Sequence, residues 1–294
     1  MKNWMYPILV VFAASCYGIL STIIKLAMNA GFTASEAVSS QYIVGFFIVL
    51  LLFIVTQRKI PRISGVKTLL LAGSLTAITG TLYGQSIVYL PASLAVVMLF
   101  QFTWIGVLLD CVLRRRKPTR GEALSLVFLF AGTILAAGVI DADLSGIAWQ
   151  GWAYGIAAAL SFSLFIRINM RQIEGMNTTT RLFFVSFVAM LAISLFQNPE
   201  IVWNGQLFAE GLWIYGLALG TFGILLPIYL FTIAVPKVGG SMASILSAME
   251  LPVAVTVSVL VLSEPITFLQ IVGILIIIFG MILPGLLQRK RNYT

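Results

Sequence analysis

Hydrophobic residues along the chain occur in long runs separated by short polar segments. A membrane-crossing helix needs about 20 mainly apolar residues, and ten runs of roughly that length follow one another. The segments between them are too short to hold a water-soluble domain. The pattern therefore predicts an all-α membrane protein with ten transmembrane helices. The expected spans are residues 5–27, 34–56, 68–89, 92–113, 122–140, 151–170, 180–197, 209–234, 239–262 and 266–287.

The composition fits a protein that is solvated by lipid. Of the 294 residues, 60% are hydrophobic and only 10% are charged, whereas an ordinary soluble domain carries about 25% charged residues. A chain with so few charges cannot cover a water-facing surface of this size. The net charge of +8 does not indicate a nucleic-acid partner. The basic residues form short clusters between apolar runs instead of a stripe on a soluble surface.

The distribution of basic residues predicts the orientation in the membrane. If the N-terminus is cytoplasmic, every one of the 18 lysines and arginines except Lys25 falls on the cytoplasmic side. Cytoplasmic segments of membrane proteins are enriched in Lys and Arg. We therefore expect both termini to be cytoplasmic, in a bacterial-type inner (cytoplasmic) membrane. The acidic residues expected in the outer loops are Asp141, Asp143, Glu200 and Glu210.

The two halves of the chain resemble each other weakly but without gaps. Pairing Ser93 with Ser241 also pairs Thr119 with Thr267, and the same register continues across two spans. We expect one repeat at residues 1–145 and a second at 146–294. Each holds five helices, an odd number, so the second repeat enters the membrane from the opposite side. Inverted repeats of this kind are typical of secondary transporters, which bind substrate near the membrane midplane.

One stretch of the second half carries a family resemblance. Residues 239–285 read GGSMASILSAMELPVAVTVSVLVLSEPITFLQIVGILIIIFGMILPG. A small-residue helix start, a Glu-x-Pro in mid-helix, a Glu-Pro-hydrophobic-Thr turn and a Gly-spaced last helix follow one another there. This stretch resembles the closing signature of EamA-type members of the drug/metabolite transporter superfamily. Residues 90–95 (LPASLA) resemble its first-half counterpart. The resemblance implies a ten-helix 5+5 fold that moves small metabolites, often amino acids or amines.

The first half departs from that family pattern. Trp104 stands where the counterpart of Pro252 would be, and Arg116 stands where the counterpart of Glu264 would be. An arginine that is common early in the second helix is replaced by Gln41. Substrate assignments made through those positions do not transfer to this chain.

Glu250 is the residue most indicative of function. It lies near the middle of the ninth predicted span, where a carboxylate costs about 2.5–3.5 kcal/mol on insertion scales. It must therefore carry a proton or face a cation or a water-filled cavity. One interpretation is a proton-coupling carboxylate or an anchor for an ammonium group. The other is a protonated carboxyl that binds backbone carbonyls freed by Pro252, which lacks an N–H.

Further polar and aromatic side chains lie deep in the predicted spans. Pockets for small molecules combine apolar and aromatic walls with a few convergent polar groups, so these residues are candidates for the substrate-binding site together with Glu250. For each of them, packing or hydrogen bonding between helices is the alternative. The candidates are Gln41, Tyr42, Tyr83, Gln85, Gln101, Trp104 and Tyr229.

Two basic residues near the ends of spans are candidates for gating or charge steering. Lys25 lies near the outer end of the first span. It can extend to the lipid headgroups, or it can line an outer vestibule and meet Glu36 or a substrate carboxylate. Arg167 lies near the inner end of the sixth span. It either contributes to the positive charge of the cytoplasmic side, or it binds a carboxylate or takes part in gating.

The chain carries no signal of catalytic chemistry. It has no histidine, and Cys16 and Cys111 do not have the spacing of metal ligands. No phosphate-binding glycine loop is present. We therefore expect no enzyme activity, no cofactor and no metal site, and a gradient instead of ATP as the driving force.

Together these features predict a secondary transporter of a small organic metabolite that works by alternating access. An amino acid or an amine is the expected substrate, and the proton is the candidate coupling ion. A monomer is expected, because one chain holds both halves of the site. The alternatives are an exporter of lipophilic cations, a non-saturable channel or scramblase, and a membrane scaffold or sensor that transports nothing.

Overall fold

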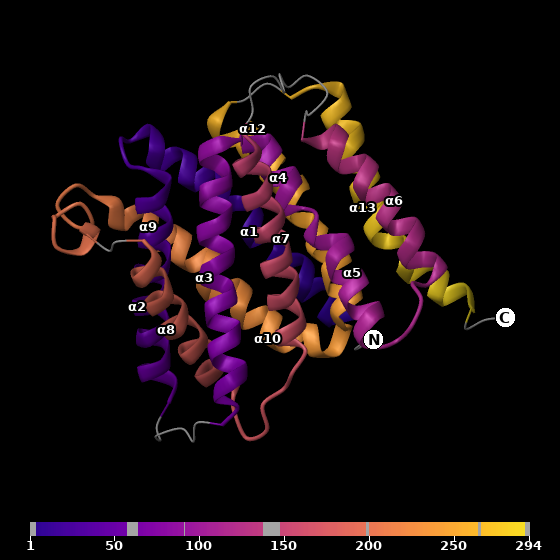
Figure 1. The fold of residues 1–294 in the computed structure, drawn as a ribbon, viewed down its shortest axis with the longest axis horizontal. Coiled ribbons are helices and arrows are strands. Elements are labelled where there is room, and N and C mark those ends of the chain that lie inside the picture. The colour runs from indigo at the N-terminus through magenta and orange to yellow at the C-terminus, as the bar shows by residue number, and fades with distance from the viewer. Residues whose placement is uncertain are drawn as a thin grey trace.

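The computed structural model describes residues 4–57, 64–90, 92–137, 148–197, 200–263 and 266–291, and these form a bundle of α-helices without β-strands (Figure 1). Nine helical segments among them are long and apolar enough to cross a membrane. The remaining expected span, the fifth (122–140), corresponds to the shorter helix α6, and residues 138–140 of that span lie outside the described part of the chain. The all-α membrane fold is thereby confirmed. The uninterrupted helices are α1 (Met5–Asn29), α2 (Ala34–Thr56), α3 (Val66–Tyr89), α6 (Arg120–Ala136), α7 (Trp149–Asn169), α8 (Thr178–Phe196) and α13 (Phe268–Arg291).

Three of the expected spans are interrupted. The fourth consists of α4 (Ala92–Leu99) and α5 (Phe102–Leu113). The eighth consists of α9 (Leu212–Gly220), a π-helical turn at Thr221–Leu225 and α10 (Leu226–Val238). The ninth consists of α11 (Gly240–Leu246), a 3-10 turn at Ser247–Met249 and α12 (Glu250–Leu262). A further 3-10 turn, Glu200–Val202, lies between α8 and α9.

The interruptions of the fourth and ninth spans occur at equivalent positions of the two halves. The register that pairs Ser93 with Ser241 also pairs Phe102 with Glu250, and these are the first residues of α5 and α12. In the ninth span Pro252 has no N–H to continue the helical ladder, which favours a tighter turn just before it.

The break in the fourth span has a different cause, because no proline is present there. The backbone N–H of Gln101 donates to Met98 instead of Val97. The side chain of Gln101 then donates from Nε2 to the carbonyl oxygen of Val97, at 2.9 Å. The carbonyl that the break would leave unpaired is therefore satisfied, as an apolar environment requires.

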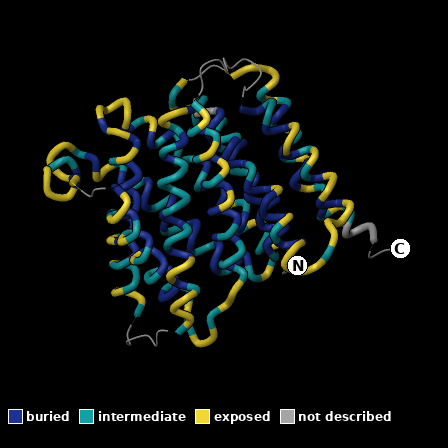
Figure 2. The backbone as a smooth tube through the Cα atoms, in the orientation of Figure 1, coloured by how far each residue is buried: buried dark blue, intermediate teal, exposed yellow. Residues whose placement is uncertain are grey.

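Helix α1 lies inside the bundle, where it packs against α12 and α10, while α3 packs against α7 and α8. Glycine allows the closest of these approaches. A Cβ at Gly18 of α1 would overlap the carbonyl oxygen of Glu250 and would touch Val253. The buried residues accordingly concentrate inside the bundle, and exposed residues line its periphery (Figure 2).

Helices α6 and α13 pack closely against each other at one side of the bundle (Figure 1). Their glycines occupy the contact: a Cβ at Gly273 would overlap the backbone of Gly132 and Ala136. The hydroxyl of Ser125 also donates to the carbonyl oxygen of Gly280, at 2.6 Å. Outside this contact, both helices expose large apolar side chains, as lipid-facing helices do.

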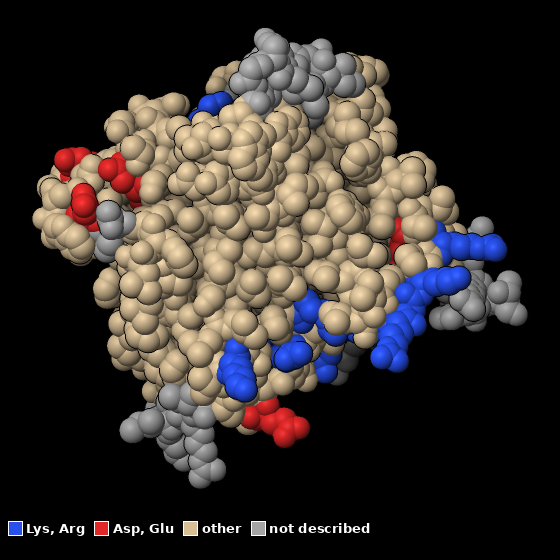
Figure 3. Space-filling view, in the orientation of Figure 1, with Lys and Arg blue, Asp and Glu red and all other residues tan. Residues whose placement is uncertain are grey.

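Charged residues separate between the two ends of the bundle (Figure 3). Most lysines and arginines lie at the end where α1 begins, and an acidic group lies at the opposite end, beside α2 and α9. Lys2, Arg58, Lys59 and Arg62, together with the side chains of Arg289–Arg291, lie outside the described residues. The polarity agrees with the predicted topology, and the cytoplasmic location of the termini stays a prediction.

We predict that Gly273→Ala lowers the stability of the α6–α13 contact by about 1–3 kcal/mol, because backbone atoms cannot move aside for the new methyl group. The matched control is Gly285→Ala on the same helix, where a Cβ would meet no atom within 4 Å. The control should be neutral or slightly stabilising, since Ala favours helix over Gly. The unfolding temperature in detergent measures both. Equal shifts would contradict the packing described.

Candidate functional site

A cavity lies in the centre of the bundle, between α1, α2, α3, α4, α7 and α12. Its volume is about 90 Å³, and its lining combines apolar and aromatic side chains with a few polar groups, as small-molecule sites do. We call it the central cavity. Its polar or ionisable lining residues are Tyr17, Ser21, Gln41, Tyr42, Thr76, Thr79, Tyr83 and Glu250, and its aromatic lining includes Phe162 and Phe165.

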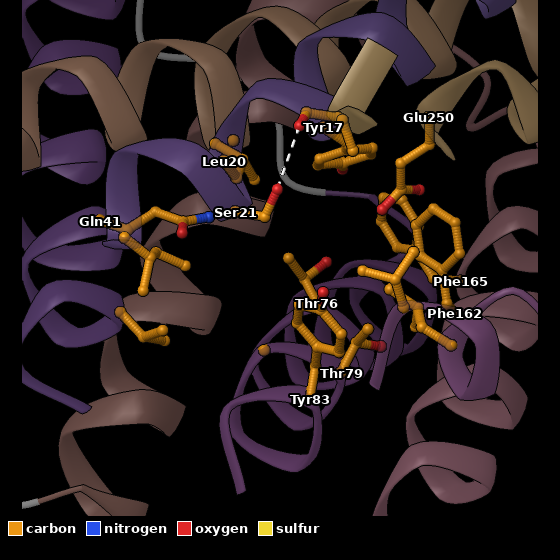
Figure 4. A pocket seen from close by; sticks show the side chains of 18 of the residues that line it. Tyr17, Leu20, Ser21, Gln41, Thr76, Thr79, Tyr83, Phe162, Phe165 and Glu250 are labelled. Carbon is orange, nitrogen blue, oxygen red and sulfur yellow. Dashed lines mark hydrogen bonds between the residues drawn. The ribbon is translucent and has the colours of Figure 1, made fainter. Parts of the chain in front are cut away.

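Among the described residues that line this cavity, Glu250 alone is an acidic or basic residue. The helix break places it there, because Glu250 begins α12 directly after the 3-10 turn. It forms no ion pair with any described residue. The cavity lies beside the Glu250 side chain (Figure 4).

Aromatic rings form one wall of the central cavity. The ring centroids of Tyr17 and Phe162 are 5.6 Å apart and nearly perpendicular, at 82°. Phe162 and Phe165 are roughly parallel, with an interplanar angle of 18° and centroids 6.1 Å apart. Figure 4 shows Phe162 and Phe165 beside Glu250. Such an arrangement presents both ring faces and ring edges to a ligand.

Hydroxyl groups of α2 and α3 form another part of the cavity lining. The hydroxyl of Tyr42 donates to the carbonyl oxygen of Thr76, at 2.7 Å. The hydroxyls of Thr76 and Thr79 donate to the carbonyl oxygens of Ala72 and Leu75, each at 2.8 Å. Each of these hydroxyls therefore donates its proton to a backbone carbonyl, and each oxygen keeps lone pairs that can accept a hydrogen bond.

A second cavity connects the central cavity to one end of the molecule. The two cavities share five lining residues, among them Ser21, Tyr83 and Ala254. The second cavity continues past Lys25 to Gln270, where α1 ends and α13 begins. We call it the outer passage. It extends from the Glu250 region toward the end opposite to the cluster of basic residues.

The other end of the bundle is held together by an ion-pair network. Arg116 donates from its two terminal nitrogens to both oxygens of Glu122, at 2.7 Å each, and to Asp110 at 2.9 Å. Asp110 also pairs with Arg114, at 2.9 Å, and Glu122 accepts a short hydrogen bond from Ser241. The hydrogen bond to Glu122 raises the pKa of Arg116, so its charge persists. The network links the fourth, fifth and ninth spans.

The structure brings four of the sequence-predicted site residues to the central cavity: Gln41, Tyr42, Tyr83 and Glu250. Lys25 lines the outer passage. Arg167 lies near the inner end, where it donates to the sulfur of Met170 at 3.2 Å. Gln85 and Tyr229, both partly buried, line neither cavity.

Gln101 and Trp104 lie in a separate groove between α5 and α6. The indole nitrogen of Trp104 donates to Oε1 of Gln101 at 2.8 Å, and the Trp104 side chain is 41% exposed. The amide of Gln101 therefore has both its groups hydrogen-bonded, one to Trp104 and the other to the Val97 carbonyl oxygen at the break of the fourth span. Both lie at the depth that the sequence indicated, but on the helix face that points away from the central cavity.

Several lining residues were not among the sequence-predicted candidates, notably Tyr17, Ser21, Thr76, Thr79 and the two phenylalanines. A signal for some of them is present in the sequence. Thr76, Thr79 and Tyr83 are spaced at three and four residues, which places them on one face of a helix. Tyr17 and Ser21 repeat the same spacing on α1. Phe162 and Phe165 carry no such signal, because phenylalanine is common throughout the spans.

Comparison with known proteins agrees with this architecture. Residues 4–138 and 149–285 match the model of the EamA-like transporter family. A solved structure titled only "Crystal structure of protein" superposes with a TM-score of 0.76 over 98% of this chain and 99% of that chain. Its sequence is 14% identical, so the similarity shows the fold alone. No curated protein matches the chain.

We predict that Arg116→Gln destabilises the protein by about 1–3 kcal/mol, because Asp110 and Glu122 are buried carboxylates that would lose their shared partner. Arg120→Gln is the matched control, since Arg120 is exposed and makes no ion pair among the described residues. Thermal unfolding of both variants measures the difference. Similar unfolding temperatures for the two variants would show that the network does not stabilise this end.

Proposed function

This chain belongs to the EamA-like transporter family, and from that premise we propose that it is a secondary transporter of a small organic metabolite in a bacterial-type cytoplasmic membrane. The proposed mechanism is alternating access. The central cavity is open through the outer passage, while the opposite end is held by the Arg116 network. An access path on one side and a closed contact on the other are what one state of such a cycle requires.

The proposed substrate carries an ammonium group, as an amino acid or an amine does. The observation that carries this proposal is the position of Glu250, a carboxylate at a helix break that lines a cavity otherwise without charge among its described residues. An ammonium group would form a charge-assisted hydrogen bond there. A proton could occupy the same carboxylate, so we propose Glu250 as the coupling residue and the proton as the coupling ion.

The proposed binding site consists of Glu250, Gln41, Tyr42 and Tyr83, together with Tyr17. Gln85, Gln101, Trp104 and Tyr229 are left out of it, because they do not line the central cavity. Lys25 is proposed to steer charge in the outer passage. Arg167 is proposed as part of the inner gate, because its partner Met170 packs against Gly240 at the start of α11.

Transport of lipophilic cations is a second candidate function. The aromatic wall of Tyr17, Phe162 and Phe165 beside Glu250 favours it, since aromatic faces attract cations. It differs from the first candidate in the size of the substrate and not in the site. A monomer suffices for either, because residues of both halves line the same cavity.

We predict that Glu250→Gln weakens ligand binding at least tenfold, a loss of about 1.4 kcal/mol or more, because the neutral amide cannot pair with an ammonium group. The measurement is thermal stabilisation of purified protein by a library of amino acids, amines, nucleosides and lipophilic cations. Glu210→Gln, an exposed acidic residue outside the cavity, is the control and should bind like the wild type.

Uptake into proteoliposomes extends the same comparison to transport. A pH gradient should drive saturable uptake by the wild type and by Glu210→Gln, and should drive none by Glu250→Gln. A ligand that stabilises Glu250→Gln as strongly as the wild type would remove Glu250 from the binding site. Uptake that never saturates would favour the channel alternative over a carrier.

A further inference from the structure

We propose that the central cavity selects an organic amine that lacks a carboxylate, with one ammonium group joined to a flat aromatic body, over the corresponding zwitterionic amino acid. This inference rests on the proposed function of the cavity as the binding site of the carrier. It goes further, because it separates two substrate classes that both contain an ammonium group.

The first argument is the balance of charge. Glu250 can supply one negative charge when it is ionised, and no lysine or arginine lines the central cavity in the described part of the chain. An amine would pair with Glu250, and the two opposite charges would neutralise each other. The carboxylate of an amino acid would enter the same desolvated space without a cationic partner, which is unfavourable in a low-dielectric site.

The second argument is the direction of the hydrogen bonds. The hydroxyls of Tyr42, Thr76 and Thr79 donate their protons to backbone carbonyls at 2.7–2.8 Å. Toward the cavity they can only accept. The hydroxyl of Ser21 also points its proton at a backbone carbonyl, that of Gly18, at 3.4 Å. These four hydroxyls suit the N–H donors of an ammonium group, whereas a carboxylate would have to use the amide of Gln41 and the hydroxyls of Tyr17 and Tyr83 as donors.

The third argument is the aromatic wall. Phe162 presents its ring perpendicular to Tyr17 and parallel to Phe165, so an aromatic ligand can pack face to face or edge to face. The same rings lie beside Glu250 in Figure 4, where they also favour a cation over a neutral group.

Three ligands with the same phenylethyl body test the inference in the wild-type protein. They are 2-phenylethylamine, phenylalanine and 3-phenylpropionate, and their affinities are measured by calorimetry and by thermal stabilisation. We expect 2-phenylethylamine to bind at least tenfold more tightly than phenylalanine, and 3-phenylpropionate not to bind. Phenylalanine binding as tightly as the amine would overturn the inference and leave the proposed carrier site intact.

Variants locate the binding that is measured. Glu250→Gln should abolish binding of 2-phenylethylamine, and Phe162→Leu should weaken it about three- to tenfold through loss of the ring contact. Phe128→Leu is the matched control, because Phe128 packs against Phe279 in the α6–α13 pair, outside the cavity. An equal loss in both phenylalanine variants would overturn the aromatic recognition.

The outcomes separate this inference from the proposed function. If none of the three ligands binds, the inference is wrong, and the ligand library of the preceding section decides whether the carrier site stands. If the library also produces no stabilisation, both fall. If Glu250→Gln does not fold, Glu250→Asp keeps the charge and should retain the order amine over amino acid with weaker affinities. A reversed order in Glu250→Asp would count against the inference.

Discussion

A carboxylate cannot remain charged in the hydrocarbon of a membrane without a partner or water, and this constraint governs the structure around Glu250. The helical segment that carries it tightens into a 3-10 turn just before it, at Ser247–Met249. Gly18 lets α1 approach that break, and the central cavity opens between them. The aromatic wall, and the hydroxyls that donate to backbone carbonyls and can accept from a ligand, then determine which cation could lie beside Glu250.

The two halves use the same backbone device for different purposes. Both fourth helices of the repeat are interrupted at equivalent positions, with Phe102 in the first half and Glu250 in the second. Phe102 is fully buried and packs edge to face against Phe162, at a centroid distance of 4.8 Å. Phe102 therefore fills the interior of the bundle, whereas Glu250 borders a cavity. The Arg116 network then holds the end of the bundle beyond Phe102. The inverted repeat therefore supplies the symmetric scaffold, and single differences within it place Glu250 at the cavity in one half and a buried phenylalanine in the other.

Hydrophobic run lengths predicted the spans and the fold class well, because lipid imposes the length and polarity of each helix. They did not predict the break in the fourth span, since no proline marks it and the side chain of Gln101 repairs the ladder. Depth in the span identified Glu250, Gln41, Tyr42 and Tyr83 as candidates. It could not distinguish them from Gln101 and Trp104, which lie at similar depth but on the other helix face. That rotation depends on how helices pack, which a single sequence does not specify.

The central claim is that Glu250 borders an accessible cavity in which an organic cation binds beside it. Labelling with a hydrophobic carbodiimide tests this most directly, because the reagent forms a stable adduct with accessible carboxyl groups inside membranes and mass spectrometry locates it. The account predicts that Glu250 is labelled in the free protein and is protected by 2-phenylethylamine, while labelling of exposed Glu210 does not change. Failure of Glu250 to react, or reaction that the amine does not suppress, would contradict the account.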